Sequence, residues 1–320
     1  MNCKVMTENN YFVMEKDDNM KYSEDTLKTW CNPLSETENS KAENVIRMIK
    51  TAISKSTDLS DLDIEIFLQG SYPNNTNVRI NSDVDVCIML TSTVFVEYPD
   101  GKTKEDYDYT DGTISYSDYK NLVLDALQDE FGSSSVIIGN KSFKIPSNSY
   151  RIGADAVAAF QLRDYKSINS TNSTNYLEGI RFYSKDGKEI TNYPKVHIQN
   201  GINKNNRTNY AYKKLVRIMK RIRNEMADDN LINDEVITSF LVECLVWNTP
   251  DSIIMNYSTW TETVRQTIAH IYNSINEDTH KNWGEVSERF YLFHSGRKWT
   301  DTGAKNFIQS AWNYLGYAND

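Results

Sequence analysis

The sequence predicts an α+β fold in two parts, a front part over residues 1–208 that combines a mixed sheet with helices and an all-helical rear part over residues 209–320. Two observations predict it. Short segments before residue 209 alternate apolar and polar residues, which is the period of a β-strand. Beyond residue 209 apolar residues recur every three or four positions, as on the buried face of a helix. There is no internal repeat that would make the two parts alike.

In the front part, an apolar stripe that includes Val45 and Ile49 predicts an amphipathic first helix, and the polar stretch from residue 98 to 118 predicts a surface excursion. Asp186-Gly187, between two apolar segments, is typical of a hairpin turn. We expect helices over residues 41–54 and 119–131, strands over 64–68, 83–90, 136–138, 142–145 and 152–160, and a polar loop over 166–175. In the rear part we expect helices over residues 210–226, 234–247, 260–276, 281–293 and 302–317.

Composition excludes several classes of protein. The chain carries 44 acidic and 35 basic side chains, so a grip on long DNA or RNA through general positive charge is not expected. Its four cysteines have no CxxC spacing, which argues against a disulfide framework and against a zinc site. No signal-like start and no stretch of about 18 apolar residues is present. We therefore expect a cytoplasmic protein that does not enter membranes.

Asp83 and Asp85 are the most informative residues. They alternate with Val84 and Val86, so both carboxylates lie on one face of a predicted strand. Two carboxylates on one face of an apolar strand are costly without a partner, and hard oxygen ligands suit Mg²⁺, with Mn²⁺ as the alternative. A divalent ion held in this way binds phosphates. Most Asp-x-Asp triplets in acidic proteins are solvated turns, but this one interrupts an apolar strand.

Asp155 is the candidate for a third metal ligand. It also interrupts a strand of small apolar residues, and it is expected to bind the catalytic metal and to help deprotonate an attacking hydroxyl. The alternative is an aspartate at a strand edge that faces water. The Gly70-Ser71 pair adds backbone amides and a hydroxyl that suit a phosphate, although taken alone it is more typical of an ordinary turn.

The helix expected over residues 210–226 buries a stripe that includes Leu215 and Met219 and leaves Lys213, Arg217 and Lys220 on the opposite face. Such a row is usually a solvated face. The concentration of basic residues in this stretch of an otherwise acidic chain instead favours binding of a triphosphate, whose negative charge they would compensate. Lys214 and Arg217 are subsidiary candidates for this role. The cations of this stretch are Lys204, Arg207, Lys213, Lys214, Arg217, Lys220, Arg221 and Arg223.

Gly-Ser, a loop, Asp-x-Asp and a distant third Asp form a pattern that resembles the polymerase-β-like nucleotidyltransferases. More closely, the chain resembles the bacterial CD-NTases, the cGAS/DncV-like nucleotidyltransferases of antiphage signalling. The resemblance extends from about residue 30 to the C-terminal helices. It rests on Trp30-Cys-Asn-Pro-Leu-Ser35, Gly70-Ser-Tyr-Pro-Asn-Asn-Thr-Asn-Val-Arg79, Ser82-Asp-Val-Asp-Val86, Pro194-Lys-Val-His-Ile-Gln-Asn-Gly201 and Lys204-Asn-Asn-Arg-Thr-Asn209.

The resemblance implies a two-lobed enzyme: residues 1–208 form the catalytic lobe with its N-terminal helix, residues 209–320 complete the nucleotide pocket, and nucleotides bind between the lobes. In this family a lysine and a serine of the helical lobe hold the donor triphosphate, and the matching residues here are Lys220 and Ser239. Asn200 has a donor and an acceptor and is a candidate for reading a base edge. His197 is interpreted as a structural, hydrogen-bonded histidine.

The predicted function is Mg²⁺-dependent joining of nucleoside triphosphates into a cyclic di- or trinucleotide second messenger, with pyrophosphate release. The resemblance also implies an effector protein that binds the product, and we expect a monomer. Two alternatives are transfer of a nucleotide to another acceptor, such as an antibiotic, a protein or an RNA end, and a catalytically silent nucleotide-binding module. The complete set of three carboxylates argues against the silent module. The bases and the linkage are left open by the sequence.

Overall fold

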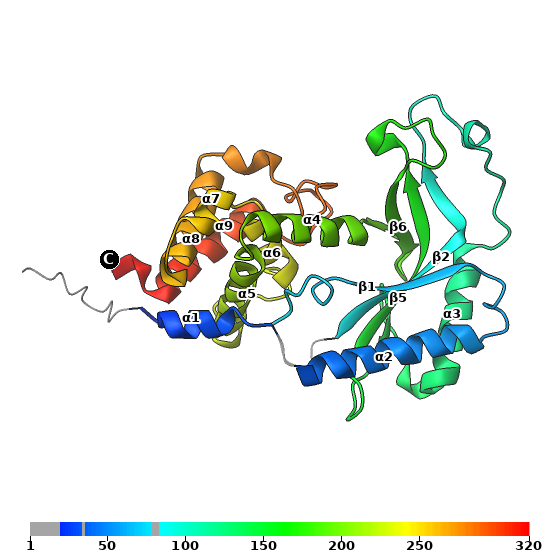
Figure 1. Ribbon diagram of the computed structural model, residues 1–320, viewed down its shortest axis with the longest axis horizontal. Helices are drawn as coiled ribbons and strands as arrows, with labels where there is room; N and C mark the ends of the chain where they lie inside the picture. The colour runs from blue at the N-terminus through cyan, green and yellow to red at the C-terminus, as the bar shows by residue number, and fades with distance from the viewer. Residues whose placement is uncertain (1–19, 34–35, 79–82, 320) are drawn as a thin grey trace, which may run out of the picture.

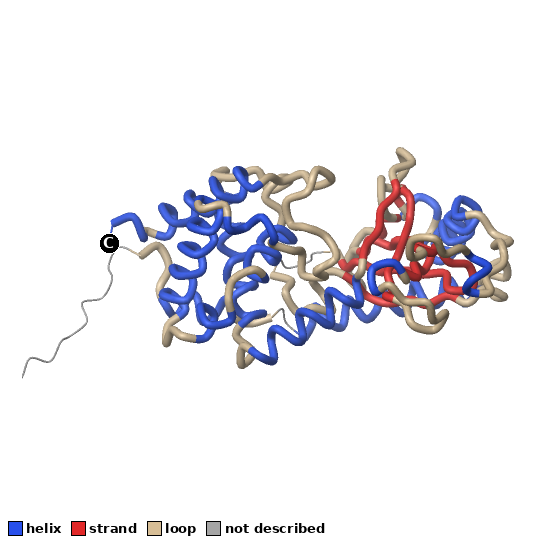
Figure 2. The backbone as a smooth tube through the Cα atoms, turned by 90° about the horizontal axis from the view of Figure 1, so that it is seen from above, coloured by secondary structure: helices blue, strands red, loops and turns tan. Residues whose placement is uncertain are grey.

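The computed structural model of the protein describes residues 20–33, 36–78 and 83–319. It has two parts, a mixed sheet with two covering helices and a bundle of helices, set side by side along the long axis (Figure 1). The view from above shows the strands gathered at one end and most helices at the other (Figure 2). The predicted α+β class is confirmed. Leu34, Ser35, Arg79 and Ser82 of the motifs quoted above lie outside the described residues.

The sheet has seven strands in the described part of the chain, in the order β1-β2-β5-β4-β3, with β6 paired to β5 and β7 paired to β6. Only β2 and β5 run parallel to each other, and the remaining pairs are antiparallel. The strands are β1 (Ile64–Gln69), β2 (Val84–Glu97), β3 (Ile137–Ile138), β4 (Phe143–Ile145), β5 (Ala154–Asp164), β6 (Leu177–Tyr183) and β7 (Glu189–Asn192).

Two helices, α2 (Glu36–Lys55) and α3 (Tyr116–Phe131), cover one face of the sheet. In β2 the residues that pack against them are Val84, Val86, Ile88 and Leu90, all fully buried. Since side chains alternate across a strand, Asp85 must lie on the opposite face. The alternating sequence of β2 therefore directs the carboxylate of Asp85 away from α2 and α3, which cover the sheet, and toward the separate bundle of helices.

The helical part has its own apolar core, to which Leu27 and Cys31 near the N-terminus also belong. The helix that carries Leu27, α1, therefore packs with the rear of the chain, although it precedes the sheet in sequence. The division at residue 208 stays a prediction. The helices outside the sheet layer are α1 (Glu24–Trp30), α4 (Pro194–Arg207), α5 (Tyr212–Asp228), α6 (Ser239–Trp247), α7 (Asp251–Met255), α8 (Trp260–Asn276) and α9 (Asp301–Leu315).

Most predicted elements are present, and α8 has the predicted bounds. The helix α6 begins five residues later than expected, because the hydroxyl of Thr238 caps it by accepting a hydrogen bond from Leu241 N. The short helix α7 and the long helix α4 were not predicted. The helix expected over residues 281–293 is wrong: this segment is a loop in which Gly284 and Tyr291 form an isolated bridge. Its spaced apolar residues are buried without a helix, with Val286 and Leu292 fully inaccessible.

Within the described part of the chain, no helix combines the length and the apolar character needed to cross a membrane. Cys31, Cys87 and Cys244 are buried free thiols, and Cys3 lies outside the described residues.

Candidate active site

The pairing of β2 with β5 brings the predicted carboxylates together. Asp85 and Asp155 are direct partners across these two parallel strands. Asp83 directly precedes β2, where Val84 N donates a hydrogen bond to Gly153 O at 2.9 Å. A Cβ atom at Gly153 would collide with Asp83 Oδ1, so the missing side chain makes room for this carboxylate. The three aspartates therefore meet where β2 and β5 begin.

Burial and neighbouring carboxylates raise the pKa of two of these groups, Asp85 and Asp83. Burial raises the pKa of Asp85 to about 7, with further contributions from the charges of Asp155 and Asp83. Burial and the charge of Asp155 also raise the pKa of Asp83, against the opposing effect of Lys144. Since a divalent cation would relieve both the mutual repulsion and the loss of solvation, the electrostatics of these strands fit a metal site.

The donor atoms also fit, because carboxylate oxygens are the ligands that Mg²⁺ and Mn²⁺ prefer. Asp155 Oδ1 accepts a hydrogen bond from Ser142 Oγ at 2.8 Å, so this carboxylate is held by a neighbouring side chain. Among the described residues no three His, Cys, Asp or Glu side chains are already gathered closely enough to hold an ion. The set therefore suits a divalent cation in chemistry, but its side chains are not arranged as a finished cage.

The Gly70-Ser71 turn follows β1 and lies beside the carboxylates. Gly70 has φ +73°, and a Cβ atom there would collide with Asp85 Oδ2. Glycine is therefore required both by the backbone conformation and by the close approach of the carboxylate. The turn is closed by Thr76 N donating to Ser71 O at 3.0 Å and by Asn74 Nδ2 donating to Gly70 O at 3.0 Å.

A cavity of about 340 Å³ joins the two parts of the molecule. On the sheet side it is lined by Gly70, Ser71 and Asp85, and on the helical side by Lys220 and Ser239. Predicted residues from both halves of the sequence thus face one space. Its remaining lining is Gln69, Asn192, Tyr193, Pro194, His197, Phe240, Glu243, Glu285, Ser287, Phe290 and Arg297.

Lys220 is held at the bottom of this cavity by a buried network. Its Nζ contacts Glu243 Oε2 at 2.6 Å and donates to Thr76 Oγ1 at 3.2 Å. His197 Nε2 contacts the other oxygen, Glu243 Oε1, at 3.1 Å. Burial alone would raise the pKa of Glu243, but Lys220 and His197 together hold it well below its usual range. An ammonium has three donors, and these two contacts use two of those of Lys220.

Lys214, Arg217 and Asn200 do not line the cavity. Lys214 is exposed on α5. The buried Arg217 donates from Nε to Cys31 O at 2.6 Å and from Nη1 to Asn75 O at 2.5 Å, so it joins α5 to the segment after α1 and to the Gly70-Ser71 loop. Asn200 donates to Val286 O at 2.8 Å. For Arg217 and Asn200 the geometry gives a structural explanation.

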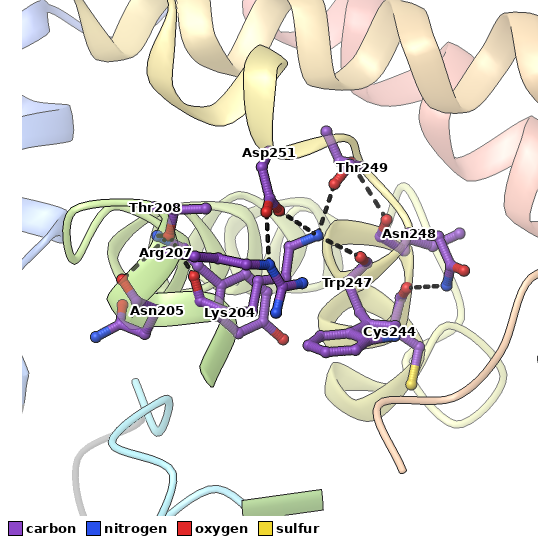
Figure 3. A network of polar contacts seen from close by, with 11 residues as sticks. Lys204, Asn205, Arg207, Thr208, Cys244, Trp247, Asn248, Thr249 and Asp251 are labelled. Carbon is purple, nitrogen blue, oxygen red and sulfur yellow. Dashed lines mark hydrogen bonds and ion pairs between the residues drawn. The ribbon is translucent and has the colours of Figure 1, made fainter. Parts of the chain in front are cut away.

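Other cations of the basic stretch also serve the fold. Lys204 in α4 donates to Trp247 O at 2.6 Å and to Thr249 O at 2.7 Å and pairs with Asp251 at 3.2 Å (Figure 3). Arg207 pairs with the same carboxylate at 2.5 Å. The prediction that this basic stretch binds a triphosphate is therefore corrected for Lys204 and Arg207. These two residues tie α4 to the turn between α6 and α7.

Sequence reasoning missed several cavity residues. Glu243 lies on the apolar helix α6, where a lone glutamate among buried residues was the available signal. Thr76 does not line the cavity but contacts Lys220 and Glu243, and it gave no signal of its own. Arg297 follows the segment over residues 281–293 that was wrongly expected to be a helix, and its Nε donates to Glu285 Oε1 at 2.6 Å.

Asp85 and the Gly-Ser turn face a helical lysine and serine across one cavity, and Asp83 and Asp155 lie beside Asp85 on the sheet. This arrangement fits a two-lobed nucleotidyltransferase. Residues 199–316 match the family described as cGAS/DncV-like nucleotidyltransferase C-terminal helical domain. Over 296 residues, 92% of this chain and 99% of the relative, the sequence is 43% identical to the cyclic dipyrimidine nucleotide synthase CdnE of Cecembia lonarensis. The chain belongs to the cGAS/DncV-like nucleotidyltransferases, the CD-NTases.

Two solved structures support this assignment. The CdnE cyclic dinucleotide synthase of Elizabethkingia meningoseptica with GTP and Apcpp has a TM-score of 0.77 at 36% identity, covering 92% of this chain and all of that chain. The CdnE c-UMP-AMP synthase of Rhodothermus marinus with Apcpp and Upnpp has a TM-score of 0.81 at 27% identity, covering 92% and 97%.

Proposed function

We propose that this chain is a cyclic dinucleotide synthase that joins two nucleoside triphosphates and releases two molecules of pyrophosphate. The observation that carries the proposal is the cavity in which Asp85, paired in register with Asp155, faces Lys220 and Ser239. Relatives that cover nearly the whole chain are named as cyclic nucleotide synthases, which supports ring closure over transfer to an unrelated acceptor.

Each transfer step is a displacement at phosphorus. A ribose hydroxyl of the acceptor nucleotide attacks the α-phosphorus of the donor, a new P–O bond forms, and the bond from the α-phosphorus to the bridging oxygen breaks, so that pyrophosphate leaves. Asp155 accepts the hydroxyl proton. In the second step the remaining triphosphate of the linear intermediate is the donor and the free ribose hydroxyl is the acceptor, which closes the ring.

The two lobes hold the donor from opposite sides. Gly70 and Ser71 offer a close backbone approach and a hydroxyl to the phosphates, while Lys220 and Ser239 bind the far end of the triphosphate from the helical side. Asp83, Asp85 and Asp155 would hold a divalent cation, Mg²⁺ or Mn²⁺. This cation would neutralise part of the negative charge of the phosphates. The pairing of Lys220 with Glu243 fixes the position of its ammonium before substrate binds.

The product is a second messenger in antiphage signalling and acts on an effector protein that binds it. We place the reaction in the cytoplasm, where nucleoside triphosphates are available, and propose that the protein acts as a monomer.

The test is incubation of the purified protein with α-labelled nucleoside triphosphates and Mg²⁺, followed by phosphatase. A cyclic product has no terminal phosphate, so its label should resist release. The Asp83→Ala/Asp85→Ala variant should give no product while remaining folded by circular dichroism. Label released entirely by phosphatase would contradict ring closure, and full activity of the double variant would contradict the carboxylate assignment.

A further inference from the structure

Asn74, in the loop that follows β1, is a buried side chain that uses only one end of its amide. It is 1% exposed. Its Nδ2 donates to Gly70 O at 3.0 Å, whereas its Oδ1 accepts no hydrogen bond within the part of the chain that the structure describes. Burial of an unsatisfied amide oxygen lowers stability, so folding alone does not explain an asparagine at this position.

The helix α4 provides the room that this amide occupies. A Cβ atom at Gly201 would lie 3.0 Å from Asn74 Oδ1, which is closer than an ordinary van der Waals contact. Gly201 is buried in the middle of α4, where the backbone conformation does not call for glycine and where glycine is less favourable than alanine. Two unfavourable choices, a glycine inside a helix and a half-satisfied amide, thus meet at one point.

The hydrogen bond from Asn74 fixes the peptide that joins Gly70 to Ser71. In a trans peptide the C=O and N–H groups lie in one plane and point in opposite directions. Gly70 O points to Asn74, which does not line the cavity, so Ser71 N–H points away from Asn74. Gly70 and Ser71 do line the cavity, and Ser71 N donates to none of the described residues. The peptide therefore offers an unused donor on the cavity side.

Other contacts hold this loop farther along the chain. Arg217 Nη1 donates to Asn75 O at 2.5 Å, and Thr76 N donates to Ser71 O at 3.0 Å. Neither contact is made to the peptide before Ser71. That peptide follows a glycine, which accepts many backbone conformations, so it rotates easily unless it is held. The contact from Asn74 opposes this rotation.

We propose that Asn74 is a positioning residue for nucleotidyl transfer. It orients the peptide between Gly70 and Ser71 so that Ser71 N–H donates to a phosphate oxygen of the donor nucleotide, and the missing side chain of Gly201 leaves the amide room to do so. The inference rests on the proposed function, because it needs a triphosphate in the cavity. Since negative charge moves onto the leaving pyrophosphate during transfer, a donor fixed in advance stabilises the transition state.

The first test isolates one transfer step. A 2′,3′-dideoxynucleoside triphosphate serves only as donor and an α,β-methylene nucleoside triphosphate only as acceptor, and all four bases are tried with the wild type. Asn74→Ala should lower kcat/KM for the donor about tenfold or more and leave the KM for the acceptor unchanged. Its melting temperature should stay close to that of wild type, because the unsatisfied oxygen is lost together with the hydrogen bond.

The matched control is Asn44→Ala on α2, which also removes an amide that donates to a backbone oxygen, Tyr150 O, at 2.8 Å. The control should keep the wild-type kcat/KM for the donor. An Asn74→Ala variant that has a lower melting temperature but an unchanged kcat/KM would show that Asn74 serves the fold alone, and it would overturn the proposal.

Gly201→Ala tests the same arrangement from α4 and leaves Asn74 in place. The added Cβ should displace the amide and lower kcat/KM for the donor, although alanine favours the helix. In the Asn74→Ala background, Gly201→Ala should cause no further loss, because the group that it displaces is already absent. Losses that multiply in the double variant, or an unchanged kcat/KM in Gly201→Ala alone, would overturn the coupling of the two residues.

Donors with sulfur at a single non-bridging α-, β- or γ-oxygen detect the backbone contact itself, because sulfur accepts hydrogen bonds more weakly than oxygen. Reactions with Cd²⁺, a softer ion, restore those losses that arise at an oxygen bound to the cation. At least one sulfur donor should still react more slowly than its oxygen counterpart with the wild type, and should lose this disadvantage with Asn74→Ala. The absence of any such donor would overturn the proposal, whereas a wild type that forms no linear product would overturn the proposed function itself.

Discussion

At the scale of single residues, the active site is built at the expense of stability. Asp85 is a carboxylate with two acidic neighbours, Asp83 and Asp155, and its pKa is raised to about 7 by burial first and by their charges second. A carboxyl group with a raised pKa in the folded state favours the protonated form. The folded protein therefore holds an extra proton between the unfolded value, about 3.9, and the folded value, and the free energy of unfolding falls as pH rises through that window.

We expect Asp85→Asn to raise the melting temperature in EDTA at pH 8, because it removes the buried charge and the repulsion. It should also reduce the loss of stability between pH 5 and pH 8. Thermal unfolding in EDTA measures both effects, with Asp129→Asn, an exposed aspartate on α3, as the control for loss of one charge. Addition of Mg²⁺ should stabilise the wild type more than Asp85→Asn. A variant that is less stable than wild type at pH 8 in EDTA would contradict this account.

At the scale of elements, the parallel pairing of β2 with β5 assembles the carboxylates. The alternation at residues 84–90 predicts the face of Asp85, but not which strand lies beside it, because the pairing joins residues about 70 positions apart. The role of Gly153 could not be predicted from the sequence either, since it depends on the close approach of Asp83, which precedes β2. The loop at 281–293 was mistaken for a helix because apolar residues at helical spacing were taken as one buried stripe, whereas tertiary packing buries them from a loop.

Gly153→Ala should lower kcat by at least about tenfold while leaving the fold intact, because its Cβ displaces the carboxylate of Asp83 and a small misplacement of a reacting group is costly. Steady-state synthesis of the product measures the effect. Gly303→Ala, in the first turn of α9, is the matched control, since its added Cβ meets only Thr300 Oγ1 at 3.3 Å. Activity of Gly153→Ala equal to that of the control would show that Asp83 tolerates the displacement.

At the scale of the whole molecule, the two parts are joined around the loop that follows β1. Arg217 of α5 donates to Asn75 O, and Thr76 Oγ1 donates to Glu243 Oε2 of α6 at 3.1 Å. The basic charge of α5 was visible in the sequence, but its use was not, because the partners are backbone carbonyls and a buried glutamate in other elements. The contacts that position Lys220 therefore also hold the two lobes together.

Glu243→Ala should destabilise the protein by about 3–5 kcal/mol, because it leaves the buried ammonium of Lys220 without its counter-charge. Glu243→Gln should cost less, since its amide keeps hydrogen-bonding capacity. The pKa of Glu243 is lowered in the folded state, so its contribution is present above its unfolded value, about 4.3, and is lost as pH falls below it. Urea unfolding from pH 7 to pH 3 measures this, and an alanine variant as stable as wild type at pH 7 would rule the network out as a stabilising contact.

We propose that one cavity between the two lobes makes a cyclic dinucleotide. The measurement that tests it most directly is the mass spectrum of the product formed from a mixture of the four nucleoside triphosphates with Mg²⁺. We expect a species with the mass of two nucleoside monophosphates less two molecules of water, absent from the Asp83→Ala/Asp85→Ala reaction. A product that retains a triphosphate, or a nucleotide attached to some other acceptor with no cyclic species present, would contradict the claim.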